Sequence, residues 1–287
     1  MLLDDQKYWL ELVLTPGMNF KDCYALLKAF GLPENIFNQS LSSLMRVIPQ
    51  SLAVAIYRHD DSEVQEKVFK VMDFLSKNPK ARLIVPSDED FPRKFYALSE
   101  PPLLTLAVGD VSLLNNETLS LVGTSHPSSD GQNITQNWTR ALLNKDLTLV
   151  QSDQAGVENI ALKTAAQFGS NPFVFVSNFR EIDANFAQQL QFMSERGLFL
   201  GALGDANQIW LGRRKLLIAA VEHFVVIEAG IRSRTLSLVR EAADAGRNVM
   251  AVPGSIHSPL SKGCHKLIRE GARLVESVDD ILEEAKN

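Results

Sequence analysis

The chain has 287 residues, an apolar fraction of 45% and a formal net charge of −5 at pH 7. This length allows one or two domains, and the composition is typical of a globular protein with a substantial core. The acidic balance excludes a uniformly basic surface but leaves room for a local basic patch. No apolar run approaches the roughly 20 residues of a membrane helix, and the N-terminus has no cationic region followed by an apolar run, as a signal peptide would.

The two cysteines, Cys23 and Cys264, lie far apart and show neither metal-ligand nor redox spacing. Both are therefore predicted to be reduced thiols in a cytoplasmic protein. The sequence indicates no metal site and no cofactor.

Residues 1–80 are predicted to form a small helical domain, because apolar residues recur at helical spacing in short segments that Gly and Pro interrupt. The clearest segments are 8–13, 20–30, 41–48 and 64–75. A packing domain is the favoured interpretation, and a helical adaptor or DNA-contacting module is the alternative.

Residues 81–115 are predicted to lead from the helices into a second domain that spans 81–287. Arg82–Pro86 has the composition of a short strand, and Leu103–Val108 is a second apolar run. We expect this segment to be a connector or an edge strand of the following sheet.

From Leu119 onward, about seven strand-like runs alternate with helix-like segments, which predicts βαβ units and a parallel sheet of the Rossmann-like α/β class. The strands are expected at 119–123, 147–150, 173–176, 198–203, 223–229, 248–254 and 273–276. Helices are expected at 132–144, 157–168, 186–196, 216–221, 236–245, 262–270 and 278–285. Ligands of such sheets bind at the carboxyl ends of the strands, here in loops that begin near Gly123, Gln151, Ser177, Gly230 and Gly254.

The first of these loops, Thr124–Gly131, stands between a strand and a helix, as in a nucleotide-binding fold. It lacks the GxGxxG fingerprint, so a dinucleotide is not indicated. His126 in this loop has no visible partner and is interpreted as a surface residue.

The stretch from Trp210 to Gly254 carries the strongest signal for an anionic ligand. In the turn Gly230–Thr235, either Ser233 or Thr235 can cap the next helix, whose free N–H groups attract anions. Arg232 and Arg234 in the same turn favour phosphate, and upstream Arg213, Arg214 and Lys215 follow Trp210. Cations beside an aromatic ring suit a single nucleic-acid strand. A solvated helix face beside a core tryptophan is the alternative, and both interpretations stay open.

Several motifs together resemble the DNA-processing protein A family, DprA, also called Smf, over nearly the whole chain. The matching residues are Phe91-Pro92, Pro101-Pro102, Gly109-Asp110, Val122-Gly123, Val225–Ala229 with Ser233, Gly246-Arg247, Ala251–Gly254, Gly263, Leu267-Ile268, Gly271-Ala272 and Asp280-Ile281. The resemblance implies a helical SAM-like domain followed by an extended Rossmann-like domain that binds single-stranded DNA. It further implies a homodimer without catalytic residues that protects incoming strands in natural transformation and loads the RecA recombinase.

We therefore expect DNA to contact residues that bracket two successive helix starts on one edge of the sheet. This set comprises Trp210, Arg213, Arg214, Lys215, Arg232, Ser233, Arg234 and Lys262. Self-association through the α/β domain is expected from the resemblance and from the apolar stretch Ile218–Val221, which one core does not fully explain.

The chain departs from the family pattern on the other side of the sheet. The family's GSR is Gly123-Thr124-Ser125 here, without the arginine, and its SGxAxGID is Gln151–Glu158, which keeps Gly156 and the final acid. An anion-binding loop made of Gly123, Thr124, Ser125 and Gly156 is thus expected to be eroded. Many members also carry a winged helix after this domain; because the sequence stops just past Asp280-Ile281, that module is expected to be absent or to have been cut away.

Two alternatives follow from these departures. A degenerate nucleotide-binding sensor or interaction module of the same fold stays possible. A phosphoribohydrolase of the LOG type is disfavoured, because its PGGxGTxxE motif has no counterpart in Glu228–Thr235.

Overall fold

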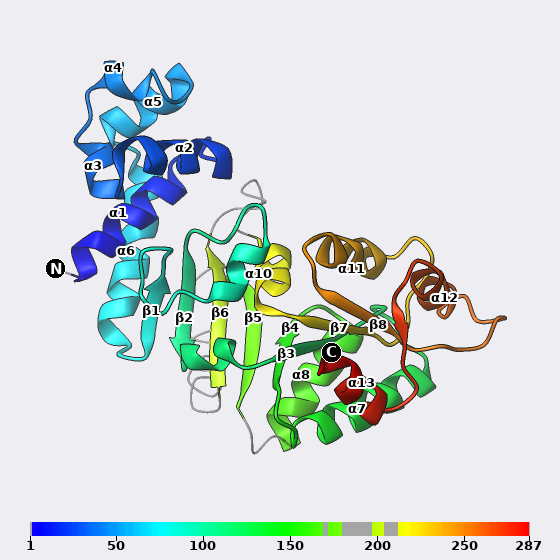
Figure 1. Cartoon of the computed structure of the whole chain (residues 1–287). Coiled ribbons are helices and arrows are strands. Elements are labelled where there is room, and N and C mark those ends of the chain that lie inside the picture. Colours follow the sequence, from blue (N-terminus) through cyan, green and yellow to red (C-terminus); the bar gives the residue numbers. More distant parts are fainter. Residues whose placement is uncertain (1, 169–171, 180–196, 204–211, 287) are drawn as a thin grey trace.

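The computed structural model describes residues 2–168, 172–179, 197–203 and 212–286. These residues form one nine-stranded sheet with helices on both faces and a group of short helices at one end (Figure 1). The predicted α/β class is confirmed. The helix predicted at 186–196 lies outside the described residues.

Six helices, most of them short, occupy residues 2–77. They are α1 (Leu2–Leu14), α2 (Phe20–Phe30), α3 (Pro33–Phe37), α4 (Leu41–Leu44), α5 (Gln50–Arg58) and α6 (Ser62–Lys77). Side chains of Asn19, Ser40 and Asp61 accept hydrogen bonds from the first-turn N–H groups of α2, α4 and α6. These caps begin each helix where the apolar spacing begins.

The strands follow one another across the sheet in the order β1-β2-β6-β5-β4-β3-β7-β8-β9. Their bounds are β1 (Ala81–Ile84), β2 (Thr105–Gly109), β3 (Thr118–Val122), β4 (Thr148–Ser152), β5 (Phe173–Phe179), β6 (Gly197–Leu203), β7 (His223–Val226), β8 (Asn248–Ala251) and β9 (Arg273–Leu274). From β6 through β9 all pairs are parallel. The predicted parallel sheet through LSLVG, VVIEA and VMAVP is therefore confirmed.

The segment between the helices and β3 contributes two full strands to the sheet. β1 pairs antiparallel with β2, and β2 pairs antiparallel with β6 over five residues, Thr105–Gly109 against Leu198–Ala202. This segment also contains two 3-10 helices, η1 (Arg93–Ala97) and η2 (Val111–Asn115). It extends the parallel sheet by two strands, of which β2 runs opposite to β6 and β1 runs opposite to β2.

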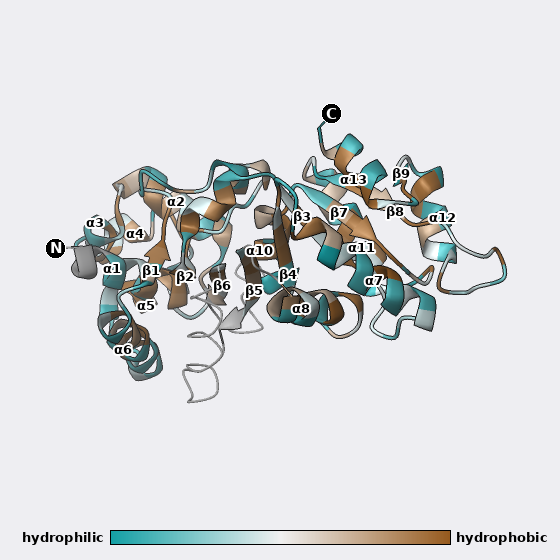
Figure 2. Cartoon of the chain, turned by 90° about the horizontal axis from the view of Figure 1, so that it is seen from below, coloured by the Kyte–Doolittle hydropathy of each residue, from teal (hydrophilic) through white to brown (hydrophobic). Residues whose placement is uncertain are grey.

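Two helical layers enclose the parallel strands (Figure 1). One consists of α10 (Arg213–Ala220), α11 (Arg234–Asp244) and α12 (Lys262–Arg269), and the other of α7 (Ser129–Leu142), α8 (Val157–Phe168) and α13 (Val278–Ala285). Alternate side chains of one strand point to opposite layers. On β7, Phe224 and Val226 pack toward α10 and α11, whereas Val225 packs toward α7 and α8. Figure 2 shows the apolar strands between helices with hydrophilic outer faces.

The N-terminal helices share a core with the antiparallel end of the sheet. Leu83 on β1, Leu106 on β2 and Phe199 on β6 belong to the same buried cluster as Leu10 and Val13 of α1. All five side chains are at most 1% exposed. Burying them together stabilises the helical group against the sheet, since each such side chain contributes about 1.5–3 kcal/mol.

The apolar stretch Ile218–Val221 is not an exposed surface. All four residues are 0% exposed within the single chain, where they lie between the sheet and η1. The expectation that this stretch serves self-association is wrong, because two layers of one chain already cover it. The apolar stretch therefore indicates only that the C-terminal end of α10 is buried.

Both cysteines are free and buried. Burial raises the pKa of each thiol to about 12, so neither is a reactive thiolate at neutral pH. Among the described residues, no helix has the length and hydropathy needed to cross a membrane.

At the amino ends of β3 and β7, a buried ion pair joins three segments of the chain. Lys94 of η1 donates to Glu222 Oε2 (2.9 Å), Thr118 Oγ1 (3.1 Å) and Asn116 O (2.7 Å). The Lys94 side chain is 8% exposed, and burial lowers its pKa while Glu222 opposes this effect. The Glu222 carboxylate also accepts the Thr118 N–H, so one acidic group holds η1 and β3 against β7.

The guanidinium of Arg247 closes the end of α10 beside this ion pair. It donates to Ile218 O (3.0 Å), Ala219 O (2.9 Å) and Lys94 O (2.6 Å). The first two are among the last carbonyls of the helix, which have no partner inside it. Gly246-Arg247, one of the family-like motifs, is therefore structural in this chain: Gly246 (φ +74°) ends α11, and Arg247 secures α10.

Replacing Glu222 with Gln should lower the free energy of unfolding by about 1–3 kcal/mol, because Lys94 stays buried without a counter-charge. Urea denaturation at pH 7 measures this change. Glu34→Gln on exposed α3 is the matched control and should change stability by less than about 0.5 kcal/mol. Equal stability of both variants would contradict a role for this ion pair.

Candidate nucleic-acid interface

The carboxyl ends of β3 and β7 form the switch point of the sheet. From β3 the chain proceeds through β4 and β5 in one direction, whereas β7, β8 and β9 lie on the other side. The helices that follow β3 and β7, α7 and α11, cover opposite faces. Ligands of open α/β sheets bind in the crevice at such a point, which here lies between the loops after β3 and β7.

A carboxylate of the protein occupies the N-terminus of α7. Glu228, two residues after β7, accepts hydrogen bonds from Ser128 N (2.8 Å) and Ser128 Oγ (2.6 Å). Ser128 is the N-cap of α7, and a Cβ at Gly131 in the first turn would lie 2.5 Å from Glu228 Oε2. Glu228 thus lies where an external phosphate would bind at a helix N-terminus.

The same two loops are joined through the backbone. Thr124 N donates to Glu228 O (2.7 Å), and Thr235 Oγ1 of α11 donates to Gly123 O (2.7 Å). Of the expected anion-binding loop, Gly123 is buried and Thr124 is half-buried, while only Ser125 is exposed. Three backbone groups that could otherwise bind a ligand are therefore already hydrogen-bonded within the chain: Gly123 O, Thr124 N and Glu228 O.

The segment Gln151–Glu158 differs from the loop that its sequence predicts. Gln151 and Ser152 are the last residues of β4 and are buried, so the loop begins only at Asp153. The β3–β4 ladder covers only two residue pairs, up to Leu119 with Leu149. In the gap that follows, the Gln151 amide is placed to donate to Leu121 O (3.0 Å) and accept from Leu121 N (2.9 Å). The Gln151 side chain therefore makes hydrogen bonds to β3 where the backbone pairing of β3 with β4 has ended.

Gly156 allows the loop after β4 to approach the loop after β3. Its φ is +93°, and a Cβ at this position would lie 2.1 Å from Thr124 O. Val157 N donates to the same carbonyl (3.3 Å). The glycine that this chain shares with the family pattern is therefore required by backbone packing, and this requirement does not depend on a ligand.

Glu158, in the first turn of α8, is a buried carboxyl group at this edge. It is 3% exposed, and its Oε2 has no hydrogen-bond partner among the described residues. Burial raises its pKa to about 8, although the backbone N–H groups of Glu158 and Gly123 and the charge of Arg213 favour the ionised form. Glu158 is therefore mostly protonated at neutral pH.

The three consecutive cations of α10 each contact a carboxylate. Arg213 pairs with Asp153 and donates to Gln154 Oε1 (2.6 Å). Arg214 pairs with Glu241 (2.6 Å) and donates to Ser237 Oγ (2.9 Å).

Lys215 pairs with Glu100. Its side chain is 20% exposed, whereas that of Arg214 is 39% exposed. The three residues therefore have different neighbours, and part of their charge is already neutralised.

The cations at the N-termini of α11 and α12 differ from those of α10, because they are exposed and have no ion pair within the described ranges. Ser233 caps α11 by accepting from Leu236 N (3.2 Å), as predicted for this turn. Arg232, Arg234 and Lys262 are exposed, and none of them makes a side-chain ion pair or hydrogen bond with any residue in the described ranges. We refer to Arg232, Arg234 and Lys262 as the open basic cluster.

Backbone hydrogen bonds bring these two helix starts together. Ala229 N donates to Leu260 O (2.7 Å), and Gly263 N donates to Ala229 O (2.8 Å). A Cβ at Gly263 would lie 2.4 Å from Ala229 O, so this contact requires a residue without a side chain. The turn after β7 and the start of α12 therefore form one unit.

The remaining predicted residues have simpler surroundings. Trp210 lies outside the described residues. His126 is exposed and contacts Ser125 Oγ (3.0 Å), in line with a surface histidine. In the part of the chain that the structure describes, no three His, Cys, Asp or Glu side chains are grouped as metal ligands. Three residues that contribute buried or hydrogen-bonded side chains to the carboxyl edge of the sheet were not predicted as site residues: Gln151, Glu158 and Glu228.

These features define a Rossmann-like α/β protein whose switch point is closed by its own side chains and whose open cations lie at two neighbouring helix starts. The family described as DNA recombination-mediator protein A matches residues 82–286, which is most of the chain. The chain therefore belongs to this family, as its motifs predicted.

Individual relatives are more distant. The DNA processing protein DprA of Streptococcus pneumoniae is 29% identical over 204 residues, which cover 69% of this chain and 72% of the relative. A DprA of Mycobacterium tuberculosis is 28% identical over 70% of this chain. The alignment spans 57% of that relative, so the chain matches little more than half of its length.

Two solved structures have the same fold. The crystal structure of Streptococcus pneumoniae DprA superposes with a TM-score of 0.73 at 23% identity and covers 96% of both chains. A Helicobacter pylori DprA, whose structure concerns its single-stranded DNA binding mode, superposes with a TM-score of 0.58 at 21% identity over 71% of this chain.

The buried Glu158 makes a testable contribution to pH dependence. Its folded-state pKa of about 8 lies above the ordinary value of 4.5, so the fold binds a proton that the unfolded chain releases. The resulting stabilisation is complete at low pH and is lost as the pH rises from about 4.5 to about 8, at up to about 1.4 kcal/mol per pH unit. Glu158→Gln should remove this loss.

Urea denaturation of both proteins between pH 5 and 9 checks this. The stability of Glu158→Gln relative to the original chain should increase with pH and level off above about 8. Glu89→Gln, an exposed carboxyl on a turn, is the control. Parallel stability profiles for Glu158→Gln and the original chain would show that Glu158 ionises freely in the fold.

Proposed function

We propose that this protein binds single-stranded DNA in DNA processing, at the carboxyl edge of its sheet. Family membership supports a role in DNA processing, and the single-stranded DNA binding mode of the Helicobacter pylori protein supports the choice of ligand. The observation that carries the proposal is the open basic cluster, Arg232, Arg234 and Lys262, at two adjoining helix N-termini.

The physical case rests on charge that is available to a ligand. Helix N-termini and unpaired cations attract phosphate, and both occur together at the start of α11. By contrast, Glu228 fills the N-terminus of α7 and carboxylates pair with the cations of α10. The strand would therefore follow α11 and α12, with Arg213, Arg214, Lys215 and Trp210 contributing at its flank.

The proposed role is binding without catalysis. Glu158 is buried and mostly protonated, and both thiols are buried. A degenerate sensor or interaction module is the second candidate, favoured by the closed switch point and the paired cations of α10.

The proposals on localisation, assembly and biological role rest on the family resemblance. We propose that the protein acts in the cytoplasm as a homodimer, protects single strands taken up in natural transformation and loads RecA onto them. We also propose that residues 1–80 form a SAM-like helical domain and residues 81–287 form the DNA-binding domain, with 81–115 joining them.

Binding of labelled oligo-dT across a salt titration tests the DNA site. The double variant Arg232→Ala/Arg234→Ala should bind at least about tenfold more weakly at low salt, and its salt slope should fall by about 1.4, because each lost phosphate contact contributes about 0.7. Arg213→Ala/Arg214→Ala should have a smaller effect, because Asp153 and Glu241 already neutralise these cations.

Arg269→Ala is the control, since Arg269 is exposed on the last turn of α12, at the end opposite Lys262. It should leave affinity and salt slope unchanged. If Arg232→Ala/Arg234→Ala binds oligo-dT like the original chain, the open basic cluster is only a solvated surface, and the interaction-module candidate gains support.

Self-association is tested by sedimentation velocity at tens of micromolar, where a homodimer should sediment with about twice the monomer mass. A variant in the buried stretch, Ala219→Ser, should leave the mass unchanged because this residue lies inside one chain. Monomer alone at this concentration would contradict the proposed dimer without affecting the DNA site.

A further inference from the structure

The start of α7 already holds an anion that belongs to the chain. Glu228, in the loop after β7, accepts hydrogen bonds from Ser128 N at Oε2 (2.8 Å) and from Ser128 Oγ at Oε1 (2.6 Å). Ser128 Oγ in turn accepts from Gly131 N (3.1 Å). Two oxygens of one carboxylate thus meet two donors of the helix cap, as the oxygens of a phosphate group do at helix N-termini.

The first turn of α7 leaves space for this carboxylate. A Cβ at Gly131 would lie 2.5 Å from Glu228 Oε2 and 2.7 Å from the carboxyl carbon. The backbone of Gly131 is helical and its φ is not positive, so its conformation would accept a residue with a side chain. Glycine is unfavourable in a helix relative to alanine. The space that the carboxylate occupies therefore explains the glycine at this position.

Backbone contacts hold Glu228 where it is. Thr124 N donates to Glu228 O (2.7 Å). The next residue, Ala229, is hydrogen-bonded at both its N–H and its carbonyl, to Leu260 O (2.7 Å) and Gly263 N (2.8 Å). The side chain of Glu228 therefore projects from a backbone that two neighbouring loops and the start of α12 fix in place.

The charge of Glu228 is not offset by a cation. Within the described ranges Glu228 makes no ion pair, although Arg232 and Arg234 follow in the same loop. Asp130, exposed in the first turn of α7, adds a second negative charge at the same helix start. The helix start itself offsets only roughly half a charge. The switch point is therefore a negative environment for any further anion.

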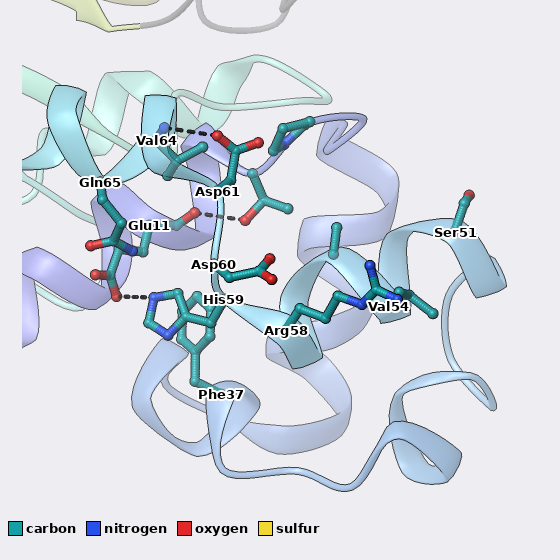
Figure 3. Close-up of a pocket in the computed structure, with 13 residues that line it drawn as sticks. Glu11, Phe37, Ser51, Val54, Arg58, His59, Asp60, Asp61, Val64 and Gln65 are labelled. Carbon is teal, nitrogen blue, oxygen red and sulfur yellow. Dashed lines mark hydrogen bonds and ion pairs between the residues drawn. The ribbon is translucent and has the colours of Figure 1, made fainter.

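A buried carboxylate in the helical group shows how such a charge is otherwise compensated. Glu11 lines a pocket of about 280 Å³ between α1, α3, α5 and the start of α6, and His59 Nε2 lies 2.9 Å from its Oε2 (Figure 3). Lys7 Nζ lies 3.6 Å from the other oxygen. Glu11 thus has basic side chains beside it, whereas the hydrogen bonds of the Glu228 carboxylate come from a helix start, as those of a bound phosphate would.

We propose that Glu228 is a specificity-determining residue that excludes free nucleotides and other terminal phosphate groups from the switch point of the sheet. A terminal phosphate carries about 1.5–2 negative charges at neutral pH and would have to displace a carboxylate that already makes charge-assisted hydrogen bonds. A phosphodiester within a strand carries a single charge and can bind at the exposed cations of the open basic cluster. The preference for a strand rests on the proposed DNA site, whereas the exclusion at α7 does not.

Isothermal titration of the full chain with inorganic pyrophosphate at constant pH and ionic strength tests the exclusion. Glu228→Ala removes the carboxylate and frees both donors of Ser128, so this variant should bind pyrophosphate at least about tenfold more tightly than the original chain. Glu34→Ala is the control, because it removes one negative charge from exposed α3, and it should bind like the original chain. Equal binding by Glu228→Ala and the original chain would overturn the proposal.

A second substitution locates the gained site. Gly131→Ala in the Glu228→Ala background places a Cβ where the carboxylate was, while alanine favours the helix, so most of the gain should be lost. A gain that persists in this double variant would contradict the assignment to the start of α7. Circular dichroism melting shows that the variants are folded, and Glu228→Ser, which is equally small, takes the place of Glu228→Ala if that variant is not.

Oligo-dT separates this inference from the proposed function. Excess ADP at matched ionic strength should not displace labelled oligo-dT from the original chain. Displacement by ADP would overturn the exclusion and favour the nucleotide-sensor candidate. If the original chain does not bind oligo-dT and Glu228→Ala still gains pyrophosphate binding, the proposed DNA site is wrong and the exclusion by Glu228 is supported.

Discussion

The contact between Glu228 and Ser128 is the constraint on which the arrangement of the ligand-binding edge depends. It joins the loop after β7 to the start of α7 across the switch point of the sheet. Thr124 and Thr235 add hydrogen bonds between the same loops. Because a carboxylate of the chain already satisfies the N-terminus of α7, an external anion must bind elsewhere on the edge. At the described part of this edge, the starts of α11 and α12 carry exposed cations without an ion pair, namely Arg232, Arg234 and Lys262.

This arrangement explains how a chain of net charge −5 can still present exposed cations without a counter-ion. Many of its cations pair with nearby acids, as Arg213 pairs with Asp153 and Arg240 with Glu270. Exposed pairs of this kind contribute little stability, but they cancel the field that a polyanion would sense. The local potential at the carboxyl edge therefore depends on which of its cations lack such partners, and the total charge has little bearing on it.

The helical group and the sheet depend on each other for burial. Side chains from α1, β1, β2 and β6 form one cluster, so the antiparallel strands provide a surface that short helices need. Isolated helices of this length are marginal in water, and most of their stability comes from packing. The same short helices leave the pocket beside Glu11, where α1, α5 and α6 meet at the turn formed by His59 and Asp60.

Local patterns were sufficient to predict most of the fold. The alternation of apolar runs and amphipathic segments predicted seven parallel strands, because period and length are local properties. The helix cap at Ser233 and the helix end at Gly246 were also predicted, since capping depends on a few neighbouring residues. The motifs shared with the family were sufficient to predict family membership.

Pairings between distant segments could not be predicted from such patterns. Ile218–Val221 suggested an interface, yet η1 and the sheet bury it within one chain. Gln151 was assigned to a loop, yet it completes the gap between β3 and β4. Arg213 and Arg232 look alike in the sequence, but only the tertiary structure sets Asp153 beside one and leaves the other open. The sequence by itself determined the elements and their order, because these depend on neighbours along the chain. The tertiary structure decided which charges are neutralised, because a counter-ion is chosen by proximity in space.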